Sequence, residues 1–261
     1  MDQNLLESEP LPGIVQLTLN RPAARNALDA ALIAALGAAI ARHGARDATR
    51  VVVIRAAGTA FCAGADLNAM LALGRGPLEA SVADAEALAA LLLAIRRCPK
   101  PTVAVVQGPA FGGGVGLACA CDVAVGGEEA LFRLPEVRLG IVPAIISPYV
   151  IEAIGIRQAR RYCLSGETIP AARARELGLL HEVVPGPMLG GEALRIATEL
   201  AAGGPLALAH CKQLLAEVAG RGPDEALGRA VAGRLAALRA GDEAQDGLAA
   251  ALARRAPRWA P

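Results

Sequence analysis

Three consecutive glycines, Gly112–Gly114, interrupt an apolar stretch of small residues near the middle of this 261-residue chain. Glycine loses more backbone freedom on folding than any other residue, so three in a row are unfavourable inside a helix or strand. Either the backbone adopts an unusual conformation here, or another group approaches the backbone closely. A tight turn between two core elements is the simpler alternative, and the surrounding sequence decides between these interpretations.

The glycines stand between a predicted strand and a predicted helix. Residues 101–108, PTVAVVQG, indicate a buried strand, and the small apolar residues after Gly114 indicate a helix. At a helix N-terminus the first N–H groups have no intrahelical acceptor and the helix dipole is positive, so negative charge is stabilised there. The sequence continues with neither the Lys-Ser/Thr pair of a phosphate-binding loop nor dinucleotide-binding spacing. We therefore expect these N–H groups to face a carbonyl oxygen that develops negative charge.

A second loop of the same kind lies earlier in the chain. Residues 61–67, FCAGADL, follow a predicted buried strand at 50–56 and lead into a short predicted helix at about 67–73. Two loops that each offer a backbone N–H after a strand can converge on one oxygen atom and form an oxyanion hole. Each loop alone is a weak signal, and the two in this order are a strong one.

The first half of the chain alternates predicted strands and helices. We expect strands at 14–20, 50–56, 101–108, 122–126 and 130–132. We expect helices from Asn26 or Asp29 to about His43, at 67–73, at 82–98 and after the glycines, with a mobile loop at 74–81. The short connections permit right-handed crossovers within one core, which indicates an α/β fold.

The second half, from Ile145 onward, is predicted to be almost entirely helical. One helix begins near Pro170 and ends at Gly178, and others are expected at 189–202, 205–219, 223–239 and 243–255. Strands disappear around residues 190–205. We therefore predict an α/β core over residues 1–200 that holds the substrate and the active site, followed by a helical oligomerisation region over residues 201–261.

Composition and charge exclude several classes of function. The chain is 54% hydrophobic and 2% aromatic, and its 26 basic and 25 acidic residues give a net charge of +1. Without a basic stripe interleaved with aromatic residues, no nucleic-acid partner is expected. The longest apolar run that resembles a helix, 30–41, is too short to span a membrane, and the acidic start MDQNLLESEP does not resemble a signal peptide.

The cysteines complete this picture. Six cysteines stand in apolar contexts without paired spacing, and Cys119 and Cys121 have no second pair or nearby histidine to complete a metal site. We expect a reduced, cytoplasmic chain without a bound metal.

Five stretches together resemble the crotonase (enoyl-CoA hydratase/isomerase) superfamily: LTLNRPAARNAL, FCAGADL, GPAFGGGVGLACACDVAV, PEVRLGIVP and GPLALAHCKQLL. The resemblance runs in the same order from about residue 13 to the C-terminus. It implies a crotonase-type spiral of ββα units with a helical C-terminal trimerisation region. It also implies an acyl-CoA substrate, no separate cofactor because coenzyme A enters as part of the substrate, and a homotrimer or a dimer of trimers.

The same resemblance assigns site residues. The oxyanion donors are the N–H groups of Ala65 and Gly113, and the acid–base residue is Glu136 in the "PE" motif. Coenzyme A is expected to bind at the backbone of Ala63, Ala65, Asp66 and Leu67, with Gly113 beside the thioester and Arg25 near the phosphates. Arg25 is equally well explained as an ordinary exposed arginine, and Glu136 has the lesser alternative of a carboxylate favoured at a helix start.

One departure from the family pattern concerns the reaction. Many hydratases of the family carry another glutamate three residues after the middle glycine, where this chain has Gly116. A single carboxylate can hydrate a double bond by taking a proton from water and delivering one to carbon. It can equally shuttle a proton between two carbons, as in a Δ3,Δ2-enoyl-CoA isomerase. Replacing Gly116 by Glu is expected to restore the two-glutamate arrangement if Gly116 has ordinary helical geometry.

A finer likeness favours hydration. Residues 135–167 lack a glycine-rich PGAGGTQRL segment and resemble bacterial 3-methylglutaconyl-CoA and isohexenylglutaconyl-CoA hydratases. Substrates of those enzymes carry a carboxylate on the acyl group, for which Arg138 is a candidate partner, unless it simply faces solvent. The leading hypothesis is an enoyl-CoA hydratase, with a branched glutaconyl-type substrate. The alternatives are the isomerase and a non-catalytic protein of this fold that binds coenzyme A.

Overall fold

The computed structural model describes residues 4–260. Residues 1–3, which begin the acidic N-terminal stretch and the predicted core domain, and residue 261, which ends the predicted helical region, lie outside the described residues. The signal-peptide prediction therefore rests partly on residues that the structure does not describe.

The larger of two sheets has six strands in the order β1-β2-β3-β4-β6-β9. Their bounds are Leu5–Leu11 (β1), Ile14–Leu19 (β2), Val51–Ala56 (β3), Thr102–Val106 (β4), Val123–Gly127 (β6) and Glu182–Val184 (β9). The β1–β2 pair is antiparallel and all other neighbours are parallel. The short connections therefore lead to the parallel α/β sheet that the sequence predicts.

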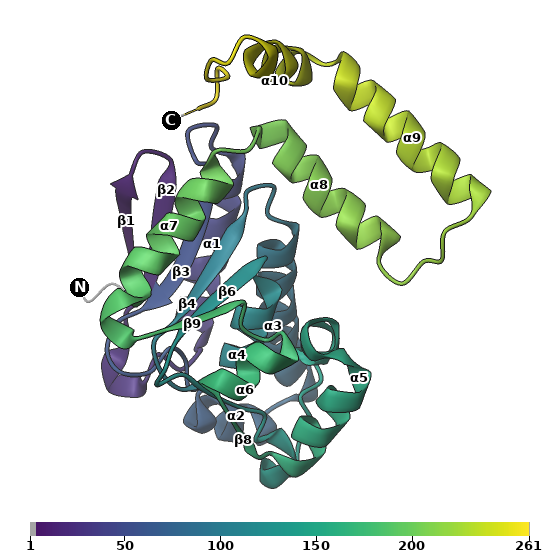
Figure 1. Cartoon of the computed structure of the whole chain (residues 1–261). Helices are drawn as coiled ribbons and strands as arrows, with labels where there is room; N and C mark the ends of the chain where they lie inside the picture. The colour runs from purple at the N-terminus through teal and green to yellow at the C-terminus, as the bar shows by residue number, and fades with distance from the viewer. Residues whose placement is uncertain (1–3, 261) are drawn as a thin grey trace.

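Both faces of this sheet are covered, which explains the continuous apolar runs in its central strands. Val52 and Ile54 of β3 belong to the core shared with helices α1 (Ala30–Ala45), α3 (Leu78–Arg97) and α4 (Gly113–Ala120). Val51 and Val53 point to the opposite face, where α7 (Leu189–Ala201) packs across the strands (Figure 1).

A smaller sheet has the strand order β5-β7-β8, and its first strand leads directly to the triple glycine. Its strands are Ala110–Phe111, Leu131–Arg133 and Thr168–Pro170. The remaining helices before α7 are α2 (Leu67–Gly74), α5 (Ser147–Ser165) and α6 (Ala171–Leu177), and α6 packs on β7 and β8. Short 3₁₀ turns are η1 (Pro22–Ala24), η2 (Glu136–Leu139) and η3 (Gly186–Met188).

Most predicted elements are confirmed, and their end signals act as expected. Asp29 caps α1 by accepting a hydrogen bond from Leu32 N at 2.8 Å, and Gly178 ends α6 in a left-handed conformation. Four strands were not predicted. Strand β1 exposes nearly every side chain, β5 has two residues, and β8 and β9 have three residues each, so none has a clear apolar alternation. Helix α3 begins at Leu78, so part of the predicted mobile loop is helical.

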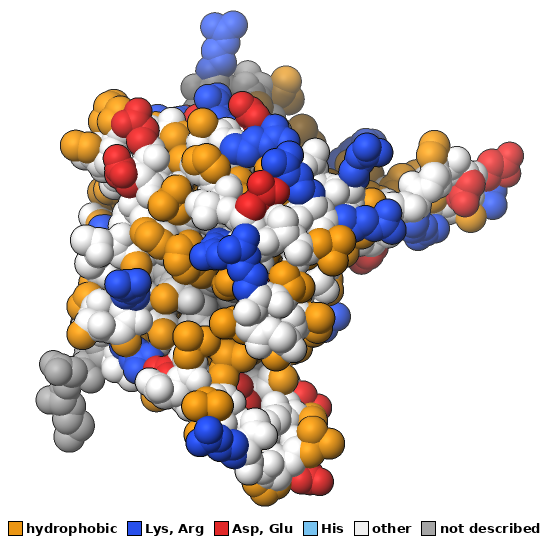
Figure 2. All heavy atoms as spheres, turned by 90° about the horizontal axis from the view of Figure 1, so that it is seen from below, with side chains coloured by type: hydrophobic (Ala, Val, Ile, Leu, Met, Phe, Trp, Pro, Cys, Tyr) orange, Lys and Arg blue, Asp and Glu red, His pale blue; other side chains and the backbone are white. Residues whose placement is uncertain are grey.

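The last three helices, α8 (Pro205–Val218), α9 (Glu225–Ala240) and α10 (Asp242–Leu252), form an arm on the body of the protein (Figure 1). Neither α8 nor α9 has a buried residue. Seen from below, the outer part of this arm projects beyond the body, and hydrophobic side chains spread among Lys, Arg and acidic groups (Figure 2). The division at residue 200, next to the last residue of α7, stays a prediction.

Two polar junctions fasten the arm. Lys212 Nζ of α8 lies 2.6 Å from Asp122 Oδ2, beside β6. Arg50, just before β3, donates to the carbonyl oxygens of Trp259 at 2.7 Å and Ala201 at 2.8 Å. The arm therefore keeps a defined place although its helices bury little of their own surface.

None of the helices in residues 4–260 is both long and apolar enough to cross a membrane. The cytoplasmic location stays a prediction.

Candidate active site

The two glycine loops meet at Gly64 and Gly113. A Cβ atom built on Gly64 would lie 3.5 Å from Gly113 N and 2.8 Å from the Phe111 carbonyl oxygen. Gly64 also has a φ of +90°, a conformation that residues with side chains rarely adopt. Glycine is therefore required at position 64 for the backbones of the two loops to approach this closely.

The two predicted oxyanion donors lie at this junction with free N–H groups. Gly113 is the first residue of α4, and neither Gly113 N nor Ala65 N donates to an acceptor within residues 4–260. Their neighbours do have acceptors: Asp66 N donates to Leu28 O at 3.2 Å, and Gly112 N donates to Arg133 O at 2.9 Å. Two adjacent loops thus each offer a free backbone donor, which is the composition of an oxyanion hole.

Glu136 lies on the glycine that precedes one of these donors. It is the first residue of η2, and its Oε1 lies 2.9 Å from the point where a Cβ on Gly112 would stand. Its other oxygen, Oε2, is buried and has no hydrogen-bond partner within residues 4–260. Burial raises the pKa of this carboxyl group, and a weaker effect of its own backbone N–H opposes the rise. A carboxyl group in this state can both accept and return a proton.

The thiols around this site do not compete for that role. Burial, and to a lesser degree the charge of Glu136, raises the pKa of Cys163. Burial raises the pKa of Cys62 and of Cys119 to about 12. These thiols are protonated at neutral pH and are poor nucleophiles. No group of three metal-ligating side chains occurs in the described part of the chain.

Comparison with known proteins agrees with this geometry. The family model for enoyl-CoA hydratase/isomerase matches residues 10–261. The 2,3-dehydroadipyl-CoA hydratase of Escherichia coli is 40% identical over 77% of this chain and 78% of its own length. The mevalonyl-coenzyme A hydratase of Aspergillus fumigatus is 33% identical over 99% of this chain and 96% of its own. The chain belongs to the enoyl-CoA hydratase/isomerase family.

Comparison with a solved structure shows that this chain also has the fold of the family. An enoyl-CoA hydratase from Shewanella pealeana superposes with a TM-score of 0.95 at 35% identity, over 99% of this chain and 96% of the other. The expected crotonase-type fold, with its helical C-terminal region, is therefore confirmed. The roles of individual site residues stay predictions, and the geometry below bears on each of them.

The residues predicted to bind coenzyme A surround the first loop of this family member. Ala63 N donates to Arg25 O at 2.9 Å, so it is not a free donor, whereas the carbonyl oxygens of Ala63 and Ala65 accept no hydrogen bond from residues 4–260. The Asp66 carboxylate caps α2 by accepting from Asn68 N at 3.0 Å.

The side chains near this loop are open to solvent. Leu67 is 60% exposed, and the Arg25 side chain is exposed as well. The loop is thus accessible to solvent. It offers the carbonyl oxygens of Ala63 and Ala65 as free acceptors and the N–H group of Ala65 as a free donor.

Sequence reasoning missed Asn26, which orients the same loop. Asn26 is fully buried with a φ of +55°, and its Nδ2 donates to the carbonyl oxygens of Ala57 at 2.8 Å and Ala60 at 2.9 Å. Its Oδ1 accepts from Arg21 N at 2.8 Å. Asparagine tolerates left-handed geometry and here joins two loops. The available signal was its position between the turn that begins at Pro22 and the following helix, which we interpreted only as a helix start.

The structure corrects the expectation for Gly116. Its backbone is helical without a positive φ, as the expectation required, but a Cβ there would overlap Ile146 Cγ2 and lie 3.2 Å from Leu92 Cδ1. Ile146 is 3% exposed and Leu92 is fully buried. The prediction that Gly116→Glu by itself gives a two-glutamate site is therefore wrong, because core side chains occupy the space that the glutamate side chain would need.

Arg138 faces solvent, as one of the two expectations has it, but its guanidinium also has a partner within the protein. It is exposed, yet its Nε and Nη2 donate to Ser165 O at 3.1 and 2.9 Å. Its guanidinium therefore lies on the C-terminal end of α5, where helix carbonyls favour a cation.

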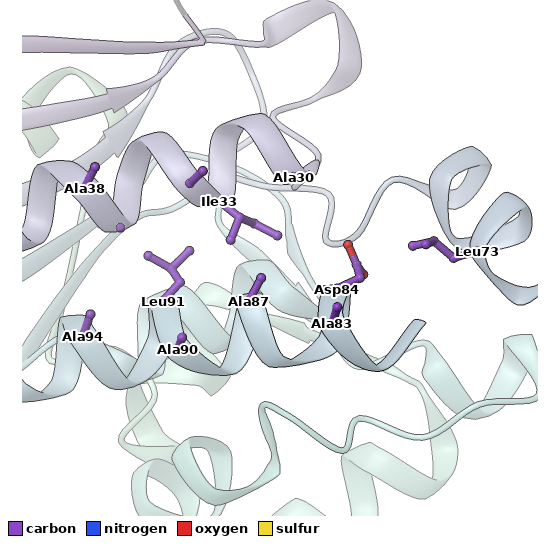
Figure 3. Close-up of a pocket in the computed structure, with 12 residues that line it drawn as sticks. Ala30, Ile33, Ala38, Leu73, Ala83, Asp84, Ala87, Ala90, Leu91 and Ala94 are labelled. Atoms are coloured by element: carbon purple, nitrogen blue, oxygen red, sulfur yellow. The ribbon is translucent and has the colours of Figure 1, made fainter. Parts of the chain in front are cut away.

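A separate groove of about 620 Å³ lies between α1 and α3. Figure 3 shows Ile33 and Ala38 of α1 opposite Ala87, Leu91 and Ala94 of α3 across this groove. Asp84 is its one ionisable lining residue. Glu136 does not line this groove, so the groove is separate from the candidate active site.

Proposed function

We propose that this protein is an enoyl-CoA hydratase that adds water across the C2–C3 double bond of an acyl-CoA thioester. One observation carries the proposal: Glu136 Oε2 is a buried carboxylate oxygen without a partner in residues 4–260, next to the loop junction with two free N–H groups. An unpaired buried carboxylate is costly, so its presence points to a use in proton transfer.

In the proposed reaction, the thioester carbonyl oxygen accepts hydrogen bonds from Ala65 N and Gly113 N. Glu136 takes a proton from a water molecule while the water oxygen bonds to C3. The electron pair of the double bond moves toward the thioester, and the resulting negative charge rests on the oxygen held by the two amides. The protonated Glu136 then gives its proton to C2, which completes the addition of one water molecule.

Coenzyme A enters this proposal only as part of the substrate, and no further cofactor is required. We assign its binding to the exposed loop of Ala63, Ala65, Asp66 and Leu67, with the Arg25 guanidinium available for a phosphate. The free acceptors at 63 and 65 and the exposure of Arg25 support this assignment. The chemistry between water and an enoyl group needs only the proton transfers described above.

The finer substrate proposal is a branched glutaconyl-type acyl group. The likeness of residues 135–167 to hydratases of such substrates supports it. By its name, the Escherichia coli relative acts on the thioester of an unsaturated dicarboxylic acid, and the Aspergillus relative on a C3-branched acyl group. Arg138 gives no support, because its guanidinium is held on the end of α5.

The test is to incubate the purified protein with crotonyl-CoA and, separately, with 3-methylglutaconyl-CoA. Hydration removes the enoyl absorbance and gives a product heavier by one water molecule.

The isomerase alternative is favoured by the single carboxylate, since Glu136 has no second acid at Gly116. It is tested with a 3-enoyl-CoA, which an isomerase converts without a change in mass. Binding of both thioesters without any conversion contradicts both enzymatic proposals and leaves the binding-protein alternative.

A further inference from the structure

The main chain of Leu28 is bonded to both neighbours of Ala65. Leu28 N donates to Gly64 O at 2.8 Å, and Leu28 O accepts from Asp66 N at 3.2 Å. Leu28 and Ala65 thereby form an isolated parallel β-bridge. In this pattern the bonds come from the residues before and after the partner, so the N–H and C=O groups of Ala65 itself point away from Leu28. The pairing explains why Ala65 N donates to no acceptor within residues 4–260.

The side chain of Leu28 reaches the second proposed donor, Gly113. Leu28 is 4% exposed, and its Cδ1 lies 2.9 Å from the point where a Cβ on Gly113 would stand. The next atoms around that point are Gly64 Cα and Leu88 Cδ2, each at 3.9 Å. Leu28 is therefore the closest support on this side of the Gly113 backbone.

Leu28 stands between two residues that are themselves anchored. Asn26 is fully buried and donates from Nδ2 to two carbonyl oxygens of the loop at 57–60, at 2.8 and 2.9 Å. Asp29 caps α1, and its Oδ2 lies 3.0 Å from Arg21 Nη2. These bonds fix the short segment that carries Leu28, so its contacts with the two glycine loops are fixed as well.

We propose that Leu28 is a positioning residue for both oxyanion donors of this enzyme. Its main chain holds the loop so that the Ala65 N–H stays free, and its side chain supports the backbone that presents the Gly113 N–H. One residue thus sets the relative position of two amides that belong to loops far apart in the sequence. The inference rests on the proposed hydratase function and adds which residue aligns its two donors.

The main-chain part of the proposal is tested without substrate, by amide hydrogen exchange resolved to single residues. A hydrogen-bonded amide exchanges only when its bond opens. We expect the N–H groups of Leu28 and Asp66 to exchange slowly and the Ala65 N–H to exchange faster than both. An Ala65 N–H that exchanges as slowly as that of Asp66 overturns the proposal.

The side-chain part is tested by kinetics. Leu28→Ala removes the support beside Gly113, and we expect kcat to fall about 10²-fold with little change in KM, since a shift of about 1 Å at a reacting group can have that effect. Leu36→Ala is the matched control, because Leu36 is fully buried on α1 in the same core. It is expected to lower the melting temperature comparably and to keep kcat. Leu28→Met fills a similar volume and is expected to keep most of the activity.

Equal kcat values for Leu28→Ala and Leu36→Ala contradict the positioning role, and so does a loss of kcat in Leu28→Met as large as that in Leu28→Ala. If Leu28→Ala does not fold, Leu28→Val against Leu36→Val measures the same difference. If the wild type converts none of the thioesters, the proposed function fails, whereas the exchange rates of Ala65 and Asp66 still decide whether Leu28 leaves the Ala65 N–H free.

Discussion

Glu136 Oε1 lies 2.9 Å from the position that a Cβ on Gly112 would occupy, so the carboxylate rests directly on the backbone that leads to the Gly113 amide. The predicted acid–base group, Glu136, and the predicted amide donor, Gly113, thereby lie on either side of one glycine. Even the methyl group of an alanine at position 112 would therefore displace the Glu136 carboxylate.

We expect Gly112→Ala to lower kcat about 10²-fold, since a displacement of about 1 Å at a reacting group can have that effect. The φ of +47° adds strain of about 1–3 kcal/mol to the folded state. Gly140→Ala is the matched control, because Gly140 has a φ of +75° with no atom within 4 Å of its Cβ position. Steady-state kinetics and urea denaturation of both variants separate strain from displacement. Equal kcat values for the two variants contradict the positional role of Gly112.

We expect Glu136→Gln to lower kcat at least about 10²-fold with little change in substrate affinity, because glutamine cannot exchange the proton. Single-turnover rates and binding titrations measure the two quantities separately. Glu128→Gln, an exposed position, is the control and keeps wild-type kinetics. If Glu136→Gln retains wild-type rates, Glu136 is not the acid–base residue.

The same variant has a predicted effect on stability. Burial raises the pKa of Glu136 above its ordinary value of 4.5, so its contribution to stability is full below about pH 4.5 and is lost as pH rises through the folded-state pKa. Glutamine carries no charge at any pH. We therefore expect Glu136→Gln to gain free energy of unfolding relative to wild type as pH rises from 4.5 to 7. Urea denaturation at several pH values tests this, and a gain that instead grows toward low pH refutes the sign.

Gly113→Pro removes one of the two free N–H groups at the position where a helix tolerates proline. We expect kcat to fall about 10²–10³-fold, the usual effect of losing one oxyanion donor. Gly113→Ala keeps the N–H, and the one atom closer than 3 Å to its Cβ is Cδ1 at the end of the Leu28 side chain, at 2.9 Å, so it is expected to retain most of the activity. A folded Gly113→Pro protein that still binds coenzyme A and turns over normally would show that the oxyanion site is misassigned.

The arm predicts self-association. Leu206, Leu215 and Leu235 on α8 and α9 are each more than half exposed, which is unusual for three large apolar residues on one hairpin. We expect light scattering to give three or six times the 26.5 kDa chain mass. Leu215→Glu with Leu235→Glu is expected to reduce this mass, whereas Leu164→Glu on α5 is not. A monomeric wild-type protein at micromolar concentration contradicts the prediction.

Local signals in the sequence were sufficient for much of this structure. Asp29 and Gly178 mark helix ends through hydrogen bonds to near neighbours, Pro170 precedes a helix with its fixed φ, and the triple glycine marks a strand-to-helix junction. The order strand, loop, helix also predicted that each of the two loops offers a backbone N–H, whereas the choice of Ala65 and Gly113 as the donors came from the family resemblance.

Contacts between distant segments could not be derived in this way. Strand β9 is three residues long and is defined by its pairing with β6, and Asn26 acts through carbonyl oxygens of another loop. Ile146 directly precedes α5, and its close approach to Gly116 depends on how α4 and α5 pack together. Only the folded arrangement shows that position 116 has no room for a side chain.

Because the two proposed oxyanion donors belong to the main chain, most amino-acid substitutions at Ala65 leave the N–H in place, and only proline deletes it. The tightly packed Gly64–Gly113 junction tolerates few replacements, but in the proposed reaction it also needs few, since there it contacts only the thioester oxygen that all substrates share. Side chains that contact the acyl group, by contrast, can change without altering this electrophilic half of the site. A lineage built on this junction can therefore acquire new acyl substrates by ordinary point mutations while the activation of the thioester is inherited unchanged.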